Sequence, residues 1–273
     1  MTRSQRTVSG WLGRTRTIVE SAPSTQDVLL ERVRARAAGD GELVLARRQT
    51  HGRGRRGRAW FAPTEGALAL SFALVPAGSA GSLGLVALAT ALGAAEAVET
   101  EAGLACAIKW PNDIVLRGRK LGGVLVDASV AAGGADEAGG ETAWAVVGLG
   151  LNVNVAEADF PPELAAGATS VSIELGRAAD IEAILERFLE RAGTHLDRVR
   201  AGASGEMRGA VEARLLARGR RVRVAGADGD GAAPVEGRLE GLDDAGRLRL
   251  VLDSGEERVI SSGDLAVGEV PDA

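Results

Sequence analysis

The sequence contains few of the residues on which disulfides, zinc sites and aromatic stacking sites depend. It has one cysteine, Cys106, which excludes an intramolecular disulfide and favours a reducing, cytoplasmic setting. With only one cysteine and two histidines in the chain, a zinc site built from Cys and His ligands is unfavourable, and we predict no metal ligands from the protein. Aromatic residues make up 3% of the chain and tyrosine is absent. This scarcity argues against a stacking surface for single-stranded nucleic acid.

Charged residues are missing from residues 67–95, a run long enough to suggest a membrane span. The segment from Pro76 to Gly81 interrupts it, so we predict a strand followed by a buried core helix from about Ser82, too short to cross a membrane. The N-terminus is polar and lacks the apolar core of a secretory signal. We therefore expect no membrane association.

Residues 47–60, by contrast, contain six arginines, three glycines and no acidic residue. Arginine offers a planar fork of donors that fits phosphate or carboxylate, and glycine lets backbone N–H groups approach a ligand. Such a segment repels itself, so we expect it to be mobile until an anionic ligand orders it. A nucleic-acid-binding module is the non-enzymatic alternative. The whole chain has a net charge of −5 although this segment contains six arginines, so the rest of the chain is strongly acidic. An acidic remainder argues against that module.

The hydrophobic pattern predicts an α+β protein with a mixed sheet flanked by helices and a small C-terminal β-barrel. Helices are expected after Ser24, over 82–101, over 180–199 and over about 206–217, with β-rich segments between them. The Ala/Gly-rich segment 128–140 is expected to be a flexible loop, and His195 to be structural or at the surface. We predict a loose arm over 1–16, a catalytic domain over 17–217 and a β domain over 218–273.

Lysine is nearly absent, and the two lysines, Lys109 and Lys120, lie close together. In a chain that otherwise uses arginine, a lysine at a strand end suggests a need for a compact ammonium group. Lys109 opens the turn sequence Lys-Trp-Pro-Asn-Asp, and Lys120 precedes Leu121-Gly-Gly123. Farther on, Gly148-Leu-Gly-Leu-Asn152 brings a carboxamide to a strand end.

Together these motifs resemble the biotin protein ligase family. The matching pieces are Ser24-Thr-Gln26, Gln49 with the glycine–arginine loop and Trp60, Lys109 to Asp113, Lys120 to Gly123, and Gly148 to Asn152. The resemblance covers about residues 20–155 and implies a class II synthetase-like catalytic domain with an SH3-like C-terminal domain. The chain has no room before Ser24 for the winged helix-turn-helix of the ligase-repressors, so we expect a monofunctional ligase without operator-specific DNA binding.

The resemblance also implies a two-step reaction. Biotin and Mg-ATP give biotinyl-5′-AMP, and the acyl group then passes to a lysine of a biotin carboxyl carrier protein or domain of an acyl-CoA carboxylase. Lys109 and Arg55 would be catalytic, stabilising the charge that develops in the transition state. Biotin would contact residues from four of these motifs: Ser24, Thr25, Gln49, Gly52, Arg53, Lys109, Gly122 and Gly123. ATP and the adenylate would contact Arg53, Arg55, Arg58, Trp60, Lys109 and Asn152.

One alternative of the same fold is a lipoate or octanoate protein ligase or transferase, whose binding loop has a different Arg/Gly pattern from residues 52–58. The sequence leaves open whether the protein is a monomer or a homodimer.

Overall fold

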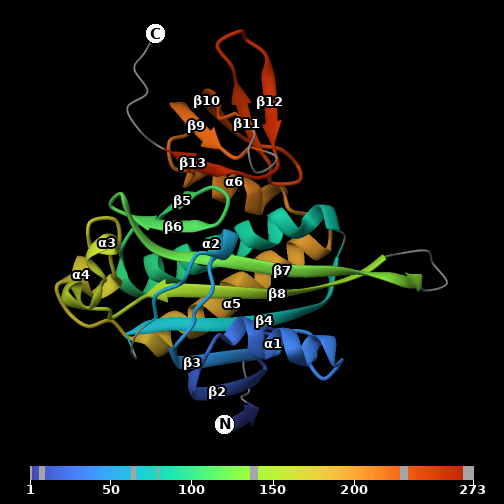
Figure 1. Ribbon diagram of the computed structural model, residues 1–273, viewed down its shortest axis with the longest axis vertical. Helices are drawn as coiled ribbons and strands as arrows, with labels where there is room; N and C mark the ends of the chain where they lie inside the picture. The colour runs from blue at the N-terminus through green and yellow to red at the C-terminus, as the bar shows by residue number, and fades with distance from the viewer. Residues whose placement is uncertain are drawn as a thin grey trace.

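The computed structural model describes residues 2–5, 10–62, 66–78, 80–135, 141–227 and 233–266. Figure 1 shows a large sheet with its helices and, at one end, a smaller β domain formed by the end of the chain. The ribbon begins at the opposite end of the molecule from that domain (Figure 1).

The large sheet has eight strands in the order β1-β2-β3-β4-β8-β7-β6-β5. Only β2 and β3 pair in parallel, and every other neighbouring pair is antiparallel. The strands are β1 (Thr2–Gln5), β2 (Thr15–Ala22), β3 (Leu43–Gln49), β4 (Ala67–Gly78), β5 (Ala107–Lys109), β6 (Asp113–Leu116), β7 (Arg119–Ala135) and β8 (Glu141–Asn152).

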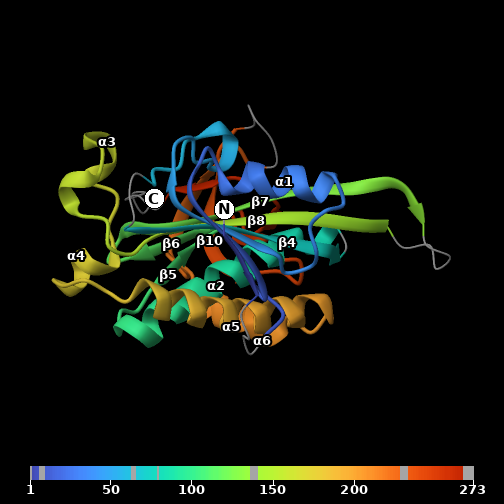
Figure 2. The same cartoon turned by 90° about the horizontal axis from the view of Figure 1, so that it is seen from below.

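Helices cover both faces of this sheet. Figure 2 shows α1 (Thr25–Arg34) on one face, and α2 (Leu83–Ala102), α5 (Ile181–Arg200) and α6 (Gly205–Ala213) on the other. The short helices α3 (Pro162–Ala165) and α4 (Val171–Leu175) lie beyond one end of β7 and β8 (Figure 2). Three short 3-10 turns are η1 (Arg55–Gly57), η2 (Ala80–Ser82) and η3 (Glu157–Asp159).

The main core lies between the sheet and the α2–α5 layer. Helix α5 presents Ile184, Leu185, Phe188 and Leu189 at helical spacing, all buried, and Asp180 caps its first turn by accepting from Ala183 N–H. Helix α2 is nearly apolar on all sides because it packs against both the sheet and α5. Among the described residues, α2 is the one helix long and apolar enough to span a membrane, yet 67% of that window is buried inside the fold.

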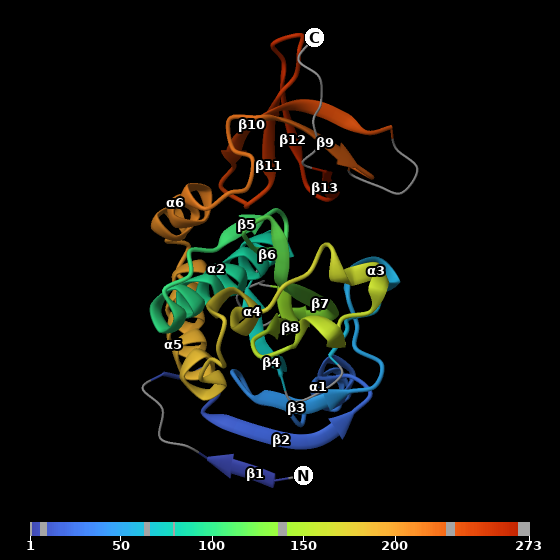
Figure 3. The same cartoon turned by 90° about the vertical axis from the view of Figure 1, so that its left-hand side faces the viewer.

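The C-terminal domain is a five-stranded antiparallel sheet in the order β12-β11-β10-β9-β13. Its strands are β9 (Arg221–Ala225), β10 (Val235–Leu242), β11 (Leu248–Val251), β12 (Glu257–Ile260) and β13 (Asp264–Ala266). Figure 3 shows it beside α6 and the β5–β6 hairpin. At this junction the buried Trp110 indole donates to Gly246 O at 3.0 Å, so the turn after β5 is bonded directly to the C-terminal domain.

The predicted fold class is confirmed, whereas several local expectations are wrong. The expected loose arm contains strand β1, buried Leu12 and buried Arg16. The expected loop over 128–140 continues strand β7 to Ala135, because its backbone pairs with β8, while 136–140 lie outside the described residues. Helix α2 agrees with the expected 82–101 to within one residue, but it is long enough to cross a membrane, contrary to the expectation. The three-residue strand β13 is too short for a sequence pattern. His195 is structural, buried and bonded to Glu96 at 2.9 Å.

Helices α2 and α5 are in close contact at Gly93, where an added Cβ would lie 2.7 Å from Ala192 N. We expect Gly93→Ala to lower the free energy of unfolding by about 1–3 kcal/mol, since the two helices would have to move apart. Urea denaturation measures this change. The matched control is Gly209→Ala in α6, where an added Cβ meets nothing within 4 Å. That variant should gain about 0.5–1 kcal/mol from helix propensity. Equal effects of both substitutions would contradict the close approach.

Candidate active site

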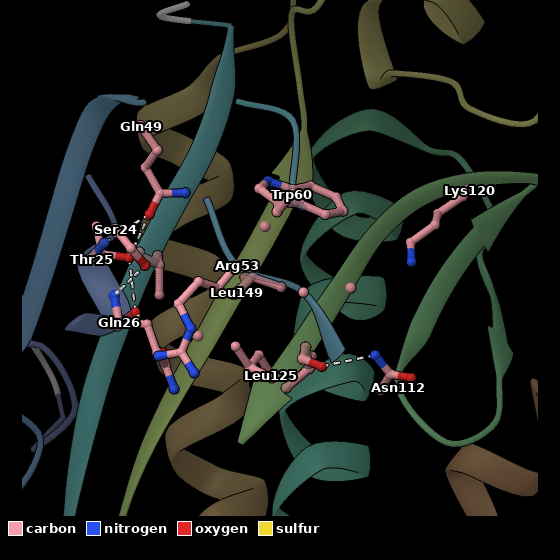
Figure 4. Close-up of a pocket in the computed structure, with 17 residues that line it drawn as sticks. Ser24, Thr25, Gln26, Gln49, Arg53, Trp60, Asn112, Lys120, Leu125 and Leu149 are labelled. Atoms are coloured by element: carbon pink, nitrogen blue, oxygen red, sulfur yellow. Dashed lines mark hydrogen bonds between the residues drawn. The ribbon is translucent and has the colours of Figure 1, made fainter. Parts of the chain in front are cut away.

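The structure has a first cavity, lined by residues of β4, β7 and β8. A polar network at the N-terminus of α1 forms one end of this cavity. Thr25 N–H and Thr25 Oγ1 both donate to Gln49 Oε1, at 2.8 and 3.1 Å, and Thr25 Oγ1 lies 2.8 Å from Ser71 Oγ. Ser71 Oγ in turn donates to Gln26 Oε1 at 3.0 Å. Ser24 caps the helix by accepting from Gln26 N–H. Figure 4 shows Ser24, Thr25, Gln26 and Gln49 gathered on one side of the cavity. Together with Ser71 they offer neutral donors and acceptors to a ligand.

Two glycines of β8, Gly148 and Gly150, make room for these groups. A Cβ at Gly148 would lie 2.7 Å from Gln26 Oε1, and one at Gly150 would lie 2.2 Å from the Trp60 ring. Both positions point to the same face of the sheet because side chains alternate along a strand. The indole of Trp60 therefore lies against bare backbone and forms a wall of the cavity.

The arginine loop crosses the sheet and is held by acidic and amide partners. Arg53 Nη1 donates to Asp27 Oδ1 at 2.7 Å and lies 3.2 Å from Asp127 Oδ2. Arg55 Nη1 donates to Asn112 Oδ1 at 2.9 Å. The loop thus has hydrogen-bond and ion-pair partners within the protein itself.

Two further loop arginines contact the C-terminal domain. Arg56 Nη1 and Arg58 Nη2 each lie 3.2 Å from a carboxylate oxygen of Asp264, and Arg56 Nη2 also donates to Gly226 O. These are contacts between side chains that are all at least partly exposed. They connect the loop to strand β13.

Lys120 lies at the boundary between two cavities. Its ammonium pairs with Asp113 Oδ1 at 2.7 Å and lies 5.8 Å from the centre of the Trp60 ring. Asp113 and Lys120 come from the neighbouring strands β6 and β7. Both Lys120 and Trp60 line the first cavity and also a second one of about 290 Å³. A charge at this point can act on groups bound in either cavity.

The second cavity has a mixed cationic and apolar lining. Arg55 and Arg58 face it from the loop, Asn152 from the end of β8, and Glu163 from α3. The apolar part is formed by Trp60, Phe61, Phe160 and Leu164. Such a surface suits a ligand that has both an anionic group and a flat or apolar part.

The charge balance of the loop favours an anionic ligand. Burial lowers the pKa of Arg55, and the positive charges of Arg56 and Arg58 lower it further, while the carboxylates of Asp264 and Asp113 oppose this shift. A lowered pKa means that the protonated guanidinium is less stable here than in water. An anion bound beside Arg55 would relieve that cost.

The cysteine is not suited to nucleophilic catalysis. Burial, followed by the charge of Glu99, raises the pKa of Cys106 to about 12, so the thiol stays protonated at neutral pH. Within the described residues, no three His, Cys, Asp or Glu side chains are grouped to hold a metal ion.

Most of the sequence-predicted site residues line the two cavities. The first cavity is lined by Ser24, Thr25, Gln49, Arg53, Trp60 and Gly123, and the second by Arg55, Arg58, Trp60 and Asn152. Three predicted residues line neither cavity. Gly52 pairs with Trp60 through its carbonyl, Gly122 points to the opposite face from Gly123, toward Ile114, and Lys109 lies on β5.

Lys109 therefore lines neither cavity, whereas Lys120 lines both. Lys109 belongs to the edge-side strand β5, and the motif turns after it so that Asn112 and Asp113 point toward the first cavity and Lys120. Several polar residues outside the predicted site line or support the first cavity: Gln26, Ser71, Asn112, Asp113 and Lys120. In the sequence, Lys120 stands out by its residue type and by the Leu121-Gly-Gly123 motif that follows it. The spacing in the sequence alone does not say which of two nearby lysines reaches the cavity.

We expect Asp264→Ala to loosen the arginine loop, because Arg56 and Arg58 lose their shared carboxylate. Hydrogen exchange at the Gly54 and Arg58 amides, which bond to Arg58 O and Arg55 O, should become several-fold faster. Global stability should fall by less than about 1 kcal/mol, since the pairs are partly exposed. Asp253→Ala, which removes an exposed partner of Arg221 within the C-terminal domain, is the control and should leave loop exchange unchanged. Unchanged exchange in Asp264→Ala would contradict the contact.

Comparison with known proteins agrees with this geometry. Residues 18–139 match the model of the Biotin/lipoate A/B protein ligase family, and residues 219–268 match that of the Biotin protein ligase C terminal domain. The chain is 34% identical over 262 residues to the Biotin--[acetyl-CoA-carboxylase] ligase of Mycobacterium tuberculosis, covering 94% of this chain and 90% of that protein. The Paracoccus denitrificans protein of the same name is 35% identical over 234 residues, 82% of this chain and 90% of that protein.

A solved structure is also similar over nearly its whole length. The biotin protein ligase of Aquifex aeolicus in complex with biotin and ATP superposes with a TM-score of 0.76 and 28% identity, covering 92% of this chain and 97% of that one. The Bifunctional ligase/repressor BirA of Bacillus subtilis, by comparison, matches over 152 residues, 45% of its length. The chain belongs to the biotin protein ligase family.

Proposed function

We propose that this chain is a biotin–[acetyl-CoA-carboxylase] ligase that forms biotinyl-5′-AMP from biotin and ATP and transfers biotin to a lysine of a carrier protein. The single observation that supports this most directly is the position of Lys120, whose side chain lines both cavities at their boundary. A ligase of this kind must bring a carboxylate and a phosphate, two anions, into contact. A cation at the meeting point of two binding cavities meets that need.

The first cavity fits the chemistry of biotin. Biotin has a neutral ureido ring that donates and accepts hydrogen bonds, an apolar chain and a carboxylate. The network around Thr25, Gln49 and Ser71 supplies neutral partners, and Leu125 and Leu149 supply apolar contact. Lipoate and octanoate have no hydrogen-bonding group at the far end of the molecule. Buried polar groups would be left without ligand partners by either acid, so the network favours biotin.

The second cavity fits ATP. Arg55 and Arg58 would bind phosphate oxygens, and the apolar wall of Trp60, Phe61 and Phe160 would contact the nucleoside. Asn152 would offer a carboxamide at the same side, while its Nδ2 already donates to Thr169 O. We propose that Mg²⁺ enters with ATP, bound to its phosphates, because the described residues offer no group of three acidic or imidazole ligands.

In the first step a biotin carboxylate oxygen attacks the α-phosphorus of ATP, and pyrophosphate leaves. Lys120 would offset the negative charge on the two approaching groups, held in place by its pair with Asp113. Arg55, oriented by Asn112, would act on the phosphate side. Burial of the mixed anhydride between the loop and the sheet would slow its hydrolysis.

In the second step the amine of a carrier lysine attacks the acyl carbon and AMP leaves. No covalent intermediate on the protein is needed, which agrees with the raised pKa of Cys106. The acceptor would be a biotin carboxyl carrier protein or domain of an acyl-CoA carboxylase. We place the reaction in the cytoplasm, where its carrier and ATP are available.

Lys120→Ala should lower biotin-dependent ATP–pyrophosphate exchange by about 100-fold or more, because one charged donor to the transition state is lost. Lys109→Ala is the matched control, since it removes the chain's other lysine from a strand that lines neither cavity. That control should retain exchange within about threefold of the wild type, as a peripheral substitution does.

The same assay separates the alternatives. Loss of exchange in Lys109→Ala with retention in Lys120→Ala would reverse the assignment of the two lysines. Exchange supported by lipoate or octanoate in place of biotin would make the chain a ligase for those acids. A protein that binds polynucleotide and exchanges with no acid would refute the enzyme.

A further inference from the structure

The backbone of Lys120 is held by a segment from much later in the chain. Lys120 N–H donates to Gly167 O at 2.7 Å, and Thr169 N–H donates to Lys120 O at 2.9 Å. These two bonds form an isolated parallel bridge between Lys120 and Ala168. Lys120 therefore has backbone partners on both sides, strand β6 and the segment 167–169. The position of its ammonium depends on where that segment lies.

The same segment supports the second cavity. Asn152 Nδ2 donates to Thr169 O at 3.0 Å, and both Thr169 and Asn152 are buried. Gly167 and Ala168 themselves line the cavity. One stretch of three residues thus fixes the lysine at the boundary of the cavities and the carboxamide on the nucleotide side.

Glu174, on α4, holds this stretch in place. Its carboxylate accepts from Thr169 Oγ1 at 2.7 Å and from Arg119 Nη2 at 2.6 Å, and it lies 3.0 Å from Arg117 Nη1. The side chain of Glu174 is only 3% exposed. Arg117 lies in the β6–β7 turn, and Arg119 begins β7 directly before Lys120. The carboxylate therefore joins the two pieces of chain that meet at Lys120.

The buried carboxylate is stable in its charged form. Burial alone would raise the pKa of Glu174, but the hydrogen bonds from Thr169 and Arg119 and the charges of Arg119 and Arg117 lower it overall. Thr169 and Arg119 donate hydrogen bonds to acceptor sites of the ionised group, and Arg117 adds an ion pair. A neutral amide of the same size would retain one acceptor oxygen and would lose the attraction to both arginines.

We propose that Glu174 is a positioning residue for adenylate formation, which fixes Lys120 and Asn152 through the segment 167–169. The proposal rests on the proposed role of Lys120. Glu174 lines neither cavity, and none of its hydrogen-bond or ion-pair partners here belongs to the Ser24–Thr25–Gln49 network. Loss of the Glu174 carboxylate should therefore lower kcat and raise the KM for ATP, while the dissociation constant for biotin stays close to that of the wild type.

The test compares Glu174→Gln and Glu174→Ala with the wild type in biotin-dependent ATP–pyrophosphate exchange. We expect kcat to fall about tenfold to hundredfold, as for a displaced catalytic group, and the KM for ATP to rise several-fold. The dissociation constant for biotin, measured by calorimetry without ATP, should stay within about twofold of the wild type. Equal kcat in Glu174→Gln and the wild type would overturn the proposal.

A buried carboxylate outside the site gives the control for general destabilisation. Glu42 is 4% exposed, pairs with Arg32 at the far end of α1, and lines neither cavity. Glu42→Ala should lower the melting temperature while leaving kcat and the KM for ATP unchanged. If Glu42→Ala and Glu174→Ala lose kcat alike, the role of Glu174 is structural only. Should Glu174→Ala fail to fold, the isosteric Glu174→Gln decides the question.

A double-mutant cycle tests whether Glu174 acts on catalysis through Lys120. In a Lys120→Ala background, Glu174→Gln should lower kcat by less than about threefold, because there is no ammonium left to misplace. An equal loss in both backgrounds would overturn positioning through Lys120. If Lys120→Ala alone leaves exchange intact, the proposed function of Lys120 fails. If it abolishes exchange while Glu174→Gln behaves like the wild type, only the role of Glu174 fails.

Discussion

The site depends on the absence of side chains at two alternate positions of strand β8. Gly148 and Gly150 leave bare backbone on one face of the central sheet, where Gln26 and the Trp60 indole lie in contact with it. Any side chain at Gly150 would overlap the indole, which separates the first cavity from the second. Because close-packed interiors cannot absorb an overlap of this size locally, the arginine loop that ends in Trp60 would have to leave the sheet.

The second constraint is electrostatic. The loop brings several guanidinium groups together, and an isolated cluster of this kind would repel itself. In the folded protein, three aspartates from distant parts of the chain contact these groups: Asp27, Asp127 and Asp264. The acidic remainder of the sequence thus has a structural role beyond solubility. Arg55 is bonded to a neutral amide, its pKa is lowered chiefly by burial, and it faces the second cavity.

The fold was largely predictable from the sequence because its main elements have strong local signals. Helix α5 has an apolar stripe and a capping aspartate, and the C-terminal strands are separated by turn residues. The site was predictable as a set of motifs, but the geometry within each motif was not. Gly122 and Gly123 differ by one residue, yet they lie on opposite faces, and only the strand register decides which one faces the cavity.

Long-range contacts explain the remaining errors. Strand β7 continues through an Ala/Gly-rich stretch because β8 pairs with it, and no local propensity reports that pairing. The choice between Lys109 and Lys120 depends on the β5–β6 and β6–β7 connections, which turn the second lysine toward Asp113 and Trp60. Glu174 gives no signal in the sequence, since its two arginine partners come from a distant part of the chain and meet it only in the folded protein.

The bond from the Trp110 indole to Gly246 O has a consequence for how the protein unfolds. Trp110 stands in the same turn as Asn112 and Asp113, and Gly246 packs on Leu85 and Leu88 of α2. One continuous apolar cluster includes Trp110, Leu85 and Leu88. It also contains Leu242, Leu248 and Val222 of the C-terminal domain. The two domains therefore share a core across their boundary, and they should melt in a single cooperative transition. Separating them would expose apolar surface on both sides and would release the turn that orients Asp113.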